Sequence, residues 1–168
     1  MTDKKKTSKN VIVLPVKRTI KGSAKARRNA ARLAAVQCLY QMQQNGMDAE
    51  QALGDYVNNR LGIEEDGNVY VAADMDVLRA ILTGIEERHA LLKEIVDKAL
   101  DPSRPLARQE QIIQAILLCG AEELFAHPEI EAGIVISSYV EVGKAFYEGR
   151  EPAMINAALD ALAKVVRN

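Results

Sequence analysis

The chain has 168 residues, of which 48% are hydrophobic, and a formal net charge of −1. A chain of this length can bury about two-thirds of its unfolded surface as one domain, and no apolar run approaches the roughly 20 residues that span a membrane. Its two cysteines, Cys38 and Cys119, have no CxxC spacing, which disfavours a disulfide and fits buried thiols in a reducing cytosol. These properties exclude a transmembrane helix and predict a cytoplasmic protein.

The charge is distributed unevenly along the chain. Residues 1–32 hold eleven of the 22 Lys and Arg residues and one of the 23 acidic residues, so this segment carries +10 and the remaining residues carry −11. A block of like charge repels itself and is stabilised when a polyanion neutralises it. The sequence therefore predicts an N-terminal arm that binds nucleic acid.

The arm begins with a Lys-rich tail over residues 1–22. Its short apolar run is interrupted by Pro15, and such a segment cannot bury enough surface to offset the entropy lost on ordering. We predict a mobile tail over 1–22, followed by a single all-α RNA-binding domain over 23–168. A transit peptide is a less favoured alternative, because residues 1–10 lack an apolar face and contain Asp3.

Apolar residues recur at helical spacing along the rest of the chain. The predicted helices cover residues 24–45, 48–61, 74–100, 108–125, 131–147 and 151–166. Ser23 is the expected N-cap of the first helix, Asn45-Gly46 its end, and Gly84 a place for a break or bend in the third helix. An acidic connection, residues 62–73, separates the second helix from the third. With short connections and no alternating strands, the pattern predicts an all-α bundle of six or seven helices.

Enzymatic chemistry has little support in the sequence. The two histidines, His89 and His127, belong to no HExxH motif, and there is no Walker loop or GxSxG motif. The acidic run 64–66 lacks the ligand spacing of a calcium loop, and Ser137-Ser138 has no histidine at a readable spacing. We therefore predict a protein that is not an enzyme and that holds no metal and no cofactor.

Basic residues form a stripe on the first helix. At about 100° per residue, one side of a helix that starts near residue 21 collects Lys21, Lys25, Arg28 and Arg32, and Arg27 widens the stripe. A solvated helix face is the alternative interpretation. However, cations in a first helical turn are unfavourable by up to about 1 kcal/mol each, and no acids at i+4 compensate them. This pattern favours a ligand-binding stripe, and phosphates are its natural ligand.

Aromatic residues that could stack on bases are scarce, and Tyr40 is expected to lie in the core. Affinity must then come mainly from Lys and Arg. With about five phosphates neutralised, the logarithm of the affinity for a single strand should fall against the logarithm of the salt concentration with a slope of roughly −3.5.

The first helix resembles the opening of a known family. Residues 27–41 read RRNAARLAAVQCLYQ, which is similar to the arginine-rich helix leading into Ala-Val-Gln-x-Leu-Tyr of the bacterial NusB transcription antitermination family. Further matches follow that family's C-terminal half in order and spacing: Ile116-Leu117, Glu123-Leu124, Ile134-Val135-Ile136, Glu141 to Phe146, Ile155-Asn156 and Leu159-Asp160. The resemblance spans about residues 24–166.

The resemblance implies a specific fold and function. The fold would consist of two packed three-helix subdomains. The function would be to bind the boxA element of ribosomal RNA transcripts together with NusE, a small-subunit ribosomal protein, and to join the elongating RNA polymerase with other Nus factors so that it reads through terminators. By position, Arg28 and Arg32 match arginines of the family's RNA-binding helix, with Lys25 and Arg27 alongside.

The chain departs from the family pattern at several positions. Asn29 and Ala30 stand where relatives often have arginine, Ser137-Ser138 replaces an Asn-Glu pair, Met154 occupies a usually aromatic position, and Ala157 replaces a glycine. We expect the Lys-rich tail to offset the missing arginines.

Other functions stay open at the level of sequence. One is a non-catalytic helical adaptor or homodimer whose basic arm touches acidic protein partners, and a self-dimer could also cover the RNA arm. Another is an RNA-binding module related to the one fused to ribosomal RNA cytosine methyltransferases, although the helical region leaves no room for a glycine-rich cofactor-binding domain.

Overall fold

A computed structural model describes residues 22–59, 64–65, 68–69 and 71–167, so the predicted tail and Lys21 lie outside the described residues. The described α-helices are α2 (Ala24–Asn45), α3 (Ala49–Asn59), α4 (Met75–Ala99), α5 (Gln111–Ala126), α6 (Ala132–Phe146) and α7 (Glu151–Val166). A short 3₁₀ helix, η2 (Leu106–Arg108), precedes α5. The predicted all-α bundle is confirmed, and the helices lie where the apolar periodicity places them.

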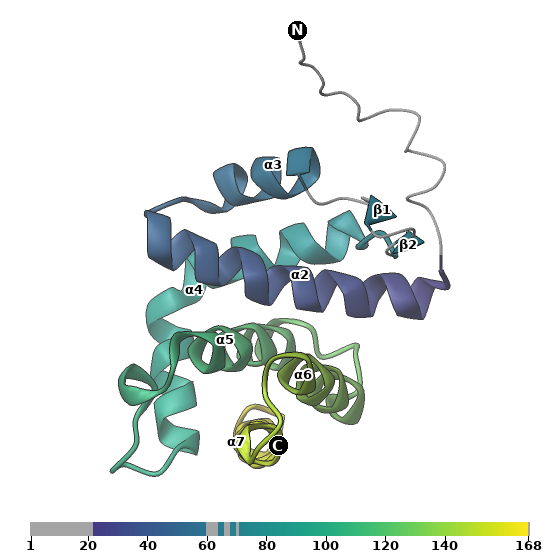
Figure 1. Cartoon of the computed structure of the whole chain (residues 1–168). Helices are drawn as coiled ribbons and strands as arrows, with labels where there is room; N and C mark the ends of the chain where they lie inside the picture. The colour runs from purple at the N-terminus through teal and green to yellow at the C-terminus, as the bar shows by residue number, and fades with distance from the viewer. Residues whose placement is uncertain (1–21, 60–63, 66–67, 70, 168) are drawn as a thin grey trace, which may run out of the picture.

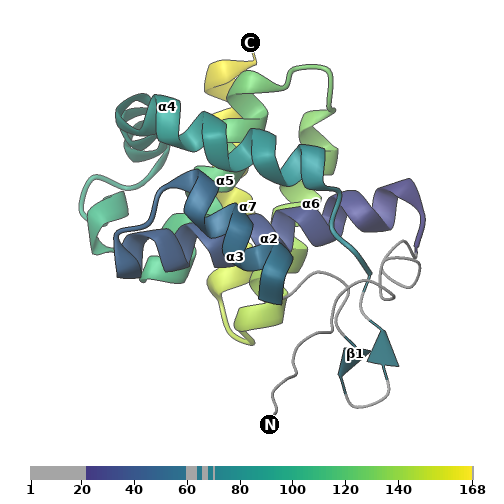
Figure 2. The same cartoon turned by 90° about the horizontal axis from the view of Figure 1, so that it is seen from above.

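The helices form two three-helix units that pack on each other (Figure 1). Helices α2, α3 and α4 make the first unit and α5, α6 and α7 the second, and α5 contacts both α2 and α4 across the boundary. Most of α5 is buried, as predicted for the most apolar helix, and one hydrophobic cluster runs through both units. Seen from above, α5 lies among the other helices of the bundle (Figure 2). The two-subdomain arrangement is confirmed.

The ends of α2 agree with the sequence prediction. Ser23 Oγ accepts a hydrogen bond from the backbone N–H of Ala26 at 3.0 Å, which satisfies one unpaired donor of the first turn. Gly46 ends the helix with φ +66°, a left-handed conformation that a residue without Cβ adopts at little cost.

The bend in α4 is not at Gly84, where the sequence allowed one, but at Arg88, whose backbone has φ −118° and ψ 22°. Gly84 has a different role. A Cβ atom there would lie 1.9 Å from Glu122 Oε2, so the absence of a side chain makes room for this carboxylate of α5. Arg88 Nε donates to Glu122 Oε1 at 3.0 Å, which places the charge partner of Glu122 at the bend itself.

The connection between α3 and α4 contains a feature that the sequence analysis did not predict. Glu64–Glu65 (β1) pairs in antiparallel register with Asn68–Val69 (β2), Glu64 opposite Val69 and Glu65 opposite Asn68. The two residues between these strands in the sequence are Asp-Gly, a pair typical of tight hairpins.

Two expectations about single side chains have different outcomes. Cys38 and Cys119 are buried as thiols, as predicted. The prediction for Tyr40 is wrong, because 37% of this residue is exposed. At about 100° per residue Tyr40 lies beyond the edge of the buried arc that is centred on Ala35 and includes Leu39.

Candidate nucleic-acid interface

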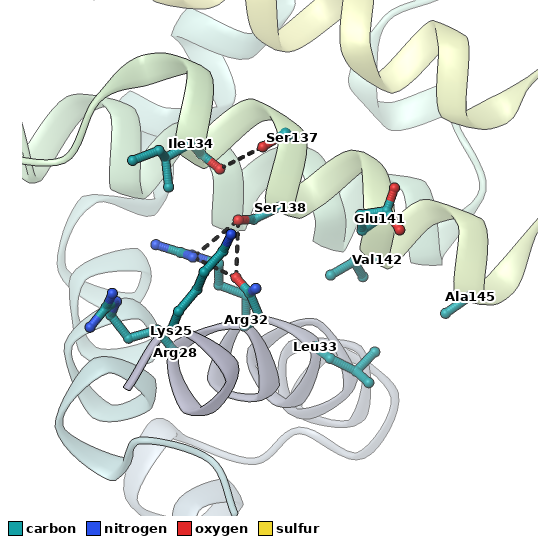
Figure 3. Close-up of a pocket in the computed structure, with 11 residues that line it drawn as sticks. Lys25, Arg28, Arg32, Leu33, Ile134, Ser137, Ser138, Glu141, Val142 and Ala145 are labelled. Carbon is teal, nitrogen blue, oxygen red and sulfur yellow. Dashed lines mark hydrogen bonds between the residues drawn. The ribbon is translucent and has the colours of Figure 1, made fainter. Parts of the chain in front are cut away.

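A groove runs between the first turns of α2 and one side of α6 (Figure 3). Its volume is about 510 Å³, within the range of about 300–1,000 Å³ that is typical of small-molecule sites. Both helices contribute polar and apolar side chains to its lining, namely Lys25, Arg28, Asn29, Arg32, Leu33, Ile134, Ser137, Ser138, Glu141, Val142 and Ala145. The groove thus brings three of the predicted basic residues together with part of α6.

Lys25 and Arg28 are the two exposed cations of this groove. No carboxylate among the described residues forms an ion pair with either of them, although 23 acidic residues are present in the chain. At the other end of the groove, Glu141 forms an ion pair with Lys144 of its own helix at 2.9 Å. The α2 side of the groove therefore carries uncompensated positive charge that can attract an anion.

Arg32 does not have the exposed position that the stripe predicted. It is 2% exposed, and its guanidinium makes a two-point contact with the buried carboxylate of Glu123 on α5, Nε to Oε2 at 2.9 Å and Nη2 to Oε1 at 3.0 Å. The reason is geometric. The basic stripe lies in the same arc of α2 as Ala35, so it runs from the open edge of the bundle into the core, and Arg32 is the first member that neighbouring helices cover.

The charge of Arg32 is fully engaged inside the protein. Burial by itself would lower its pKa, but the hydrogen bonds and the negative charge of Glu123 outweigh burial and raise the pKa. Tyr139 of α6 adds a third member, because its hydroxyl donates to Glu123 Oε2 at 2.5 Å. Burial and the charge of Glu123 raise the pKa of Tyr139 well above its ordinary value, so the phenol stays protonated as a donor.

One edge of the Arg32 guanidinium reaches the groove. Its Nη1 donates to Asn29 Oδ1 at 2.9 Å and to Ser138 Oγ at 3.1 Å, and the Ser138 hydroxyl in turn donates to Asn29 Oδ1 at 3.1 Å. Figure 3 shows Ser138 of α6 facing Arg32 of α2 across these bonds. The floor of the groove is therefore a hydrogen-bonded link between the two helices.

The remaining predicted site residues do not lie in the groove. Arg27 is partly buried on another side of α2, where its Nε donates to the carbonyl of Ala72 at 3.3 Å. Its own carbonyl accepts from the backbone N–H of Asp74 at 3.0 Å, the N-cap residue of α4. Arg27 thus fixes the segment that leads into α4. Lys21 lies outside the described residues.

Four polar residues at this interface were not predicted as site residues: Asn29, Glu123, Ser138 and Tyr139. The helix that holds Glu123 is the most apolar in the chain, and two adjacent glutamates in its interior are an anomaly that points to buried cationic partners. Ser138 carries no such signal, because its contact with Asn29 joins residues 109 positions apart.

Among the described residues, no group of three or more His, Cys, Asp or Glu side chains could hold a metal ion. Over the same residues, none of the helices combines the length and the apolar character that a membrane crossing requires.

Comparison with known proteins identifies the family. The family model described as "NusB family" matches residues 29–164, most of the chain. This chain belongs to the NusB family. The match includes α5 to α7 almost completely and begins inside α2, at Asn29, so Lys25 and Arg28 lie just before the matched region.

Related sequences agree with this assignment. The chain is 41% identical to the transcription antitermination protein NusB of Mesorhizobium japonicum, over 84% of this chain and 91% of the relative. It is 42% identical to the protein of the same name from Brucella ovis, over 84% of this chain and 82% of the relative.

Solved structures share the fold. The chain is similar to the T. maritima NusB structure, with a TM-score of 0.69 at 22% identity, over 82% of this chain and 90% of that one. It is also similar to a chain in a crystal structure of the antitermination factors NusB and NusE in complex with double-stranded RNA. The TM-score is again 0.69, at 19% identity, over 83% of this chain and 97% of that one.

Proposed function

We propose that this NusB-family protein is a non-catalytic, RNA-binding transcription antitermination factor. It recognises the boxA element of ribosomal RNA transcripts together with ribosomal protein NusE, and joins the elongating RNA polymerase. The observation that carries this proposal is the groove in which Lys25 and Arg28 are exposed beside α6 without a carboxylate partner among the described residues. A similar structure contains NusB and NusE in complex with double-stranded RNA, which supports RNA as the class of ligand here.

The predicted basic residues divide into two roles in this proposal. Lys25 and Arg28 contact phosphates, because they are exposed and their charge is not neutralised by described neighbours. Arg32 acts from below as a positioning residue, because its guanidinium is occupied by Glu123 and by the groove floor. Arg27 lies on another side of α2, so its charge adds to the positive potential of the helix and not to the groove itself. Lys21, which lies outside the described residues, stays a contact predicted from the sequence.

The direct test measures the affinity for a single-stranded RNA that carries boxA and for an RNA of the same composition with a scrambled sequence, each at two salt concentrations. Lys25→Ala and Arg28→Ala together should lower the affinity for both RNAs. They should also reduce the magnitude of the salt slope by about 1.4, since each lost phosphate contact removes about 0.7. Arg104→Ala is the matched control: it removes an exposed cation from the turn between α4 and α5 and should change neither quantity. Equal affinities for the double variant and the parent chain would reject the phosphate role.

The partner part of the proposal has its own measurement. Addition of NusE should raise the affinity for boxA RNA more than the affinity for the scrambled RNA. If the chain binds an acidic protein but neither RNA, the adaptor interpretation replaces this one.

The tail also has a defined expectation. Deletion of residues 1–20 should lower the affinity for both RNAs and flatten the salt dependence, because six of the basic residues are removed without loss of Lys25 or Arg28. Unchanged affinity and slope would show that the tail does not offset the missing arginines.

A further inference from the structure

The groove contains more than positive charge, and its polar floor has a fixed orientation. The side chain of Asn29 carries one acceptor atom and one donor group, and the two differ in what they can contact. Arg32 can only donate hydrogen bonds, and the Ser138 hydroxyl accepts from Arg32 Nη1. The atom of Asn29 that faces both of them must therefore be Oδ1, as the distances of 2.9 and 3.1 Å record.

This arrangement presents the amide Nδ2 of Asn29 as a donor. Asn29 is exposed and lines the groove, and no described residue accepts a hydrogen bond from its Nδ2. The amide is held through its Oδ1 atom, by a buried arginine whose own position is fixed by Glu123 and by a serine on the opposite helix. A preorganised donor of this kind loses little conformational freedom when a ligand acceptor binds it.

The walls of the groove indicate which ligand fits. Leu33 and Val142 line it, and Ile134 is 48% exposed at its edge. A phosphate gains nothing from apolar walls, whereas a nucleobase has two apolar faces and a polar edge. Single-stranded RNA is recognised through unstacked bases that pack on side chains and form hydrogen bonds along their edges.

We propose that Asn29 is a specificity-determining residue of this protein, whose Nδ2 donates to an acceptor on the edge of an unstacked RNA base seated between α2 and α6, with Ser138 as its positioning residue. This inference rests on the proposed function. It divides the groove into a phosphate part, Lys25 and Arg28, and a base part, Asn29 and Ser138. The two residues of the base part come from different helices and are in direct hydrogen-bond contact.

The experiment uses the full chain and the same two RNAs, one with boxA and one scrambled, at two salt concentrations. Asn29→Ala should lower the affinity for boxA RNA about tenfold, the loss of one base contact, and leave the scrambled RNA and both salt slopes unchanged. Asn58→Ala is the matched control, because it truncates an exposed asparagine on α3. Lys25→Ala should instead lower the affinity for both RNAs by the same factor.

Two further variants separate base reading from a structural effect. Asn29→Asp keeps the shape and the acceptor toward Arg32 but replaces the outward donor with an acceptor. This substitution should remove the preference for boxA RNA. The new carboxylate also repels phosphates, but this repulsion affects both RNAs equally and cancels in the ratio of their affinities. Ser138→Ala should lower the preference about threefold in the parent chain and have no effect in the Asn29→Ala chain, because Ser138 acts through Asn29.

The outcomes are distinguishable. An unchanged preference in Asn29→Ala and Asn29→Asp, while Lys25→Ala still weakens binding, would overturn the inference and leave the proposed function intact. An equal loss for both RNAs in Asn29→Ala would assign Asn29 to the phosphate part and also overturn it. If the parent chain binds neither RNA, the proposed function fails first.

Discussion

Two adjacent glutamates on α5 hold the two sides of this molecule in different ways. Glu123 faces α2 and α6, where Arg32 is 2% exposed and Tyr139 completes the contact. Glu122 is fully buried and faces α4, where the side chain of Arg88 is 31% exposed. On the groove side both members of the ion pair are almost completely shielded from water. On the α4 side water can reach the guanidinium of Arg88.

This difference indicates how the fold supports the candidate site. A sealed pair fixes the position of Arg32 and therefore of Asn29 and Ser138, which Arg32 contacts directly. The half-open pair at Arg88 coincides with the bend in α4. Because a buried charge that loses its partner costs more than a partly solvated one, the two sides should respond unequally to the same type of substitution.

The largest effect is expected for Arg32→Ala. The substitution leaves Glu123 buried beside the Tyr139 hydroxyl without a cation, so the free energy of unfolding should fall by about 3–5 kcal/mol in chemical denaturation. Arg28→Ala, one turn earlier on α2 and exposed, should change it by less than about 0.5 kcal/mol. Similar small changes for both variants would contradict the structural role of Arg32.

A rescue variant sharpens this test. Replacing both members of the pair with apolar residues, Arg32→Met with Glu123→Leu, removes the uncompensated charge and should recover much of the stability. The preference for boxA RNA should not recover, because Asn29 and Ser138 lose the guanidinium that contacts both of them. This pattern would separate the role of Arg32 in stability from its role in positioning Asn29 and Ser138. A loss of the preference for boxA RNA in Arg32→Ala alone would not distinguish the two roles.

A smaller effect is expected on the α4 side. Arg88→Ala leaves Glu122 buried, but the opening at Arg88 allows water to approach the carboxylate. We expect a decrease of about 2–3 kcal/mol in the free energy of unfolding, measured under the same conditions, and unchanged affinity for RNA. A decrease larger than that of Arg32→Ala would reverse the comparison between the two sides.

The sequence predicted the helices well because their signals are local. Apolar spacing, the Ser23 cap and the Asn45-Gly46 end are each readable within a few residues, and the structure confirms them. The angular spacing of the basic stripe was also readable, but not the point along α2 at which other helices cover it. Arg28 and Arg32 differ by one helical turn and have opposite exposures, and that difference depends on the docking of α5 and α6.

The same limit applies to the bend in α4 and to the groove floor. A glycine inside a helix predicts a flexible point. The role of Gly84 is instead to leave room for the carboxylate of Glu122, 38 positions later in the chain. The contact of Asn29 with Ser138 spans 109 positions. Each of these depends on tertiary packing, for which a local pattern carries no signal.

The smallest effect, and the most selective one for the α4 side, is expected for Gly84→Ala. The new Cβ would meet Glu122 Oε2 at 1.9 Å and Arg88 Nη2 at 2.7 Å, so the carboxylate and guanidinium must both shift. The gain in helix propensity from glycine to alanine, about 1 kcal/mol, opposes this strain. We expect a net decrease of about 1–2 kcal/mol in the free energy of unfolding.

Gly54→Ala on α3 is the control. A Cβ atom there meets nothing within 4 Å, so the substitution should raise the free energy of unfolding by about 0.5–1 kcal/mol. If both substitutions stabilise the protein, the Glu122 side chain can move freely, and the ion pair with Arg88 does not hold the bend.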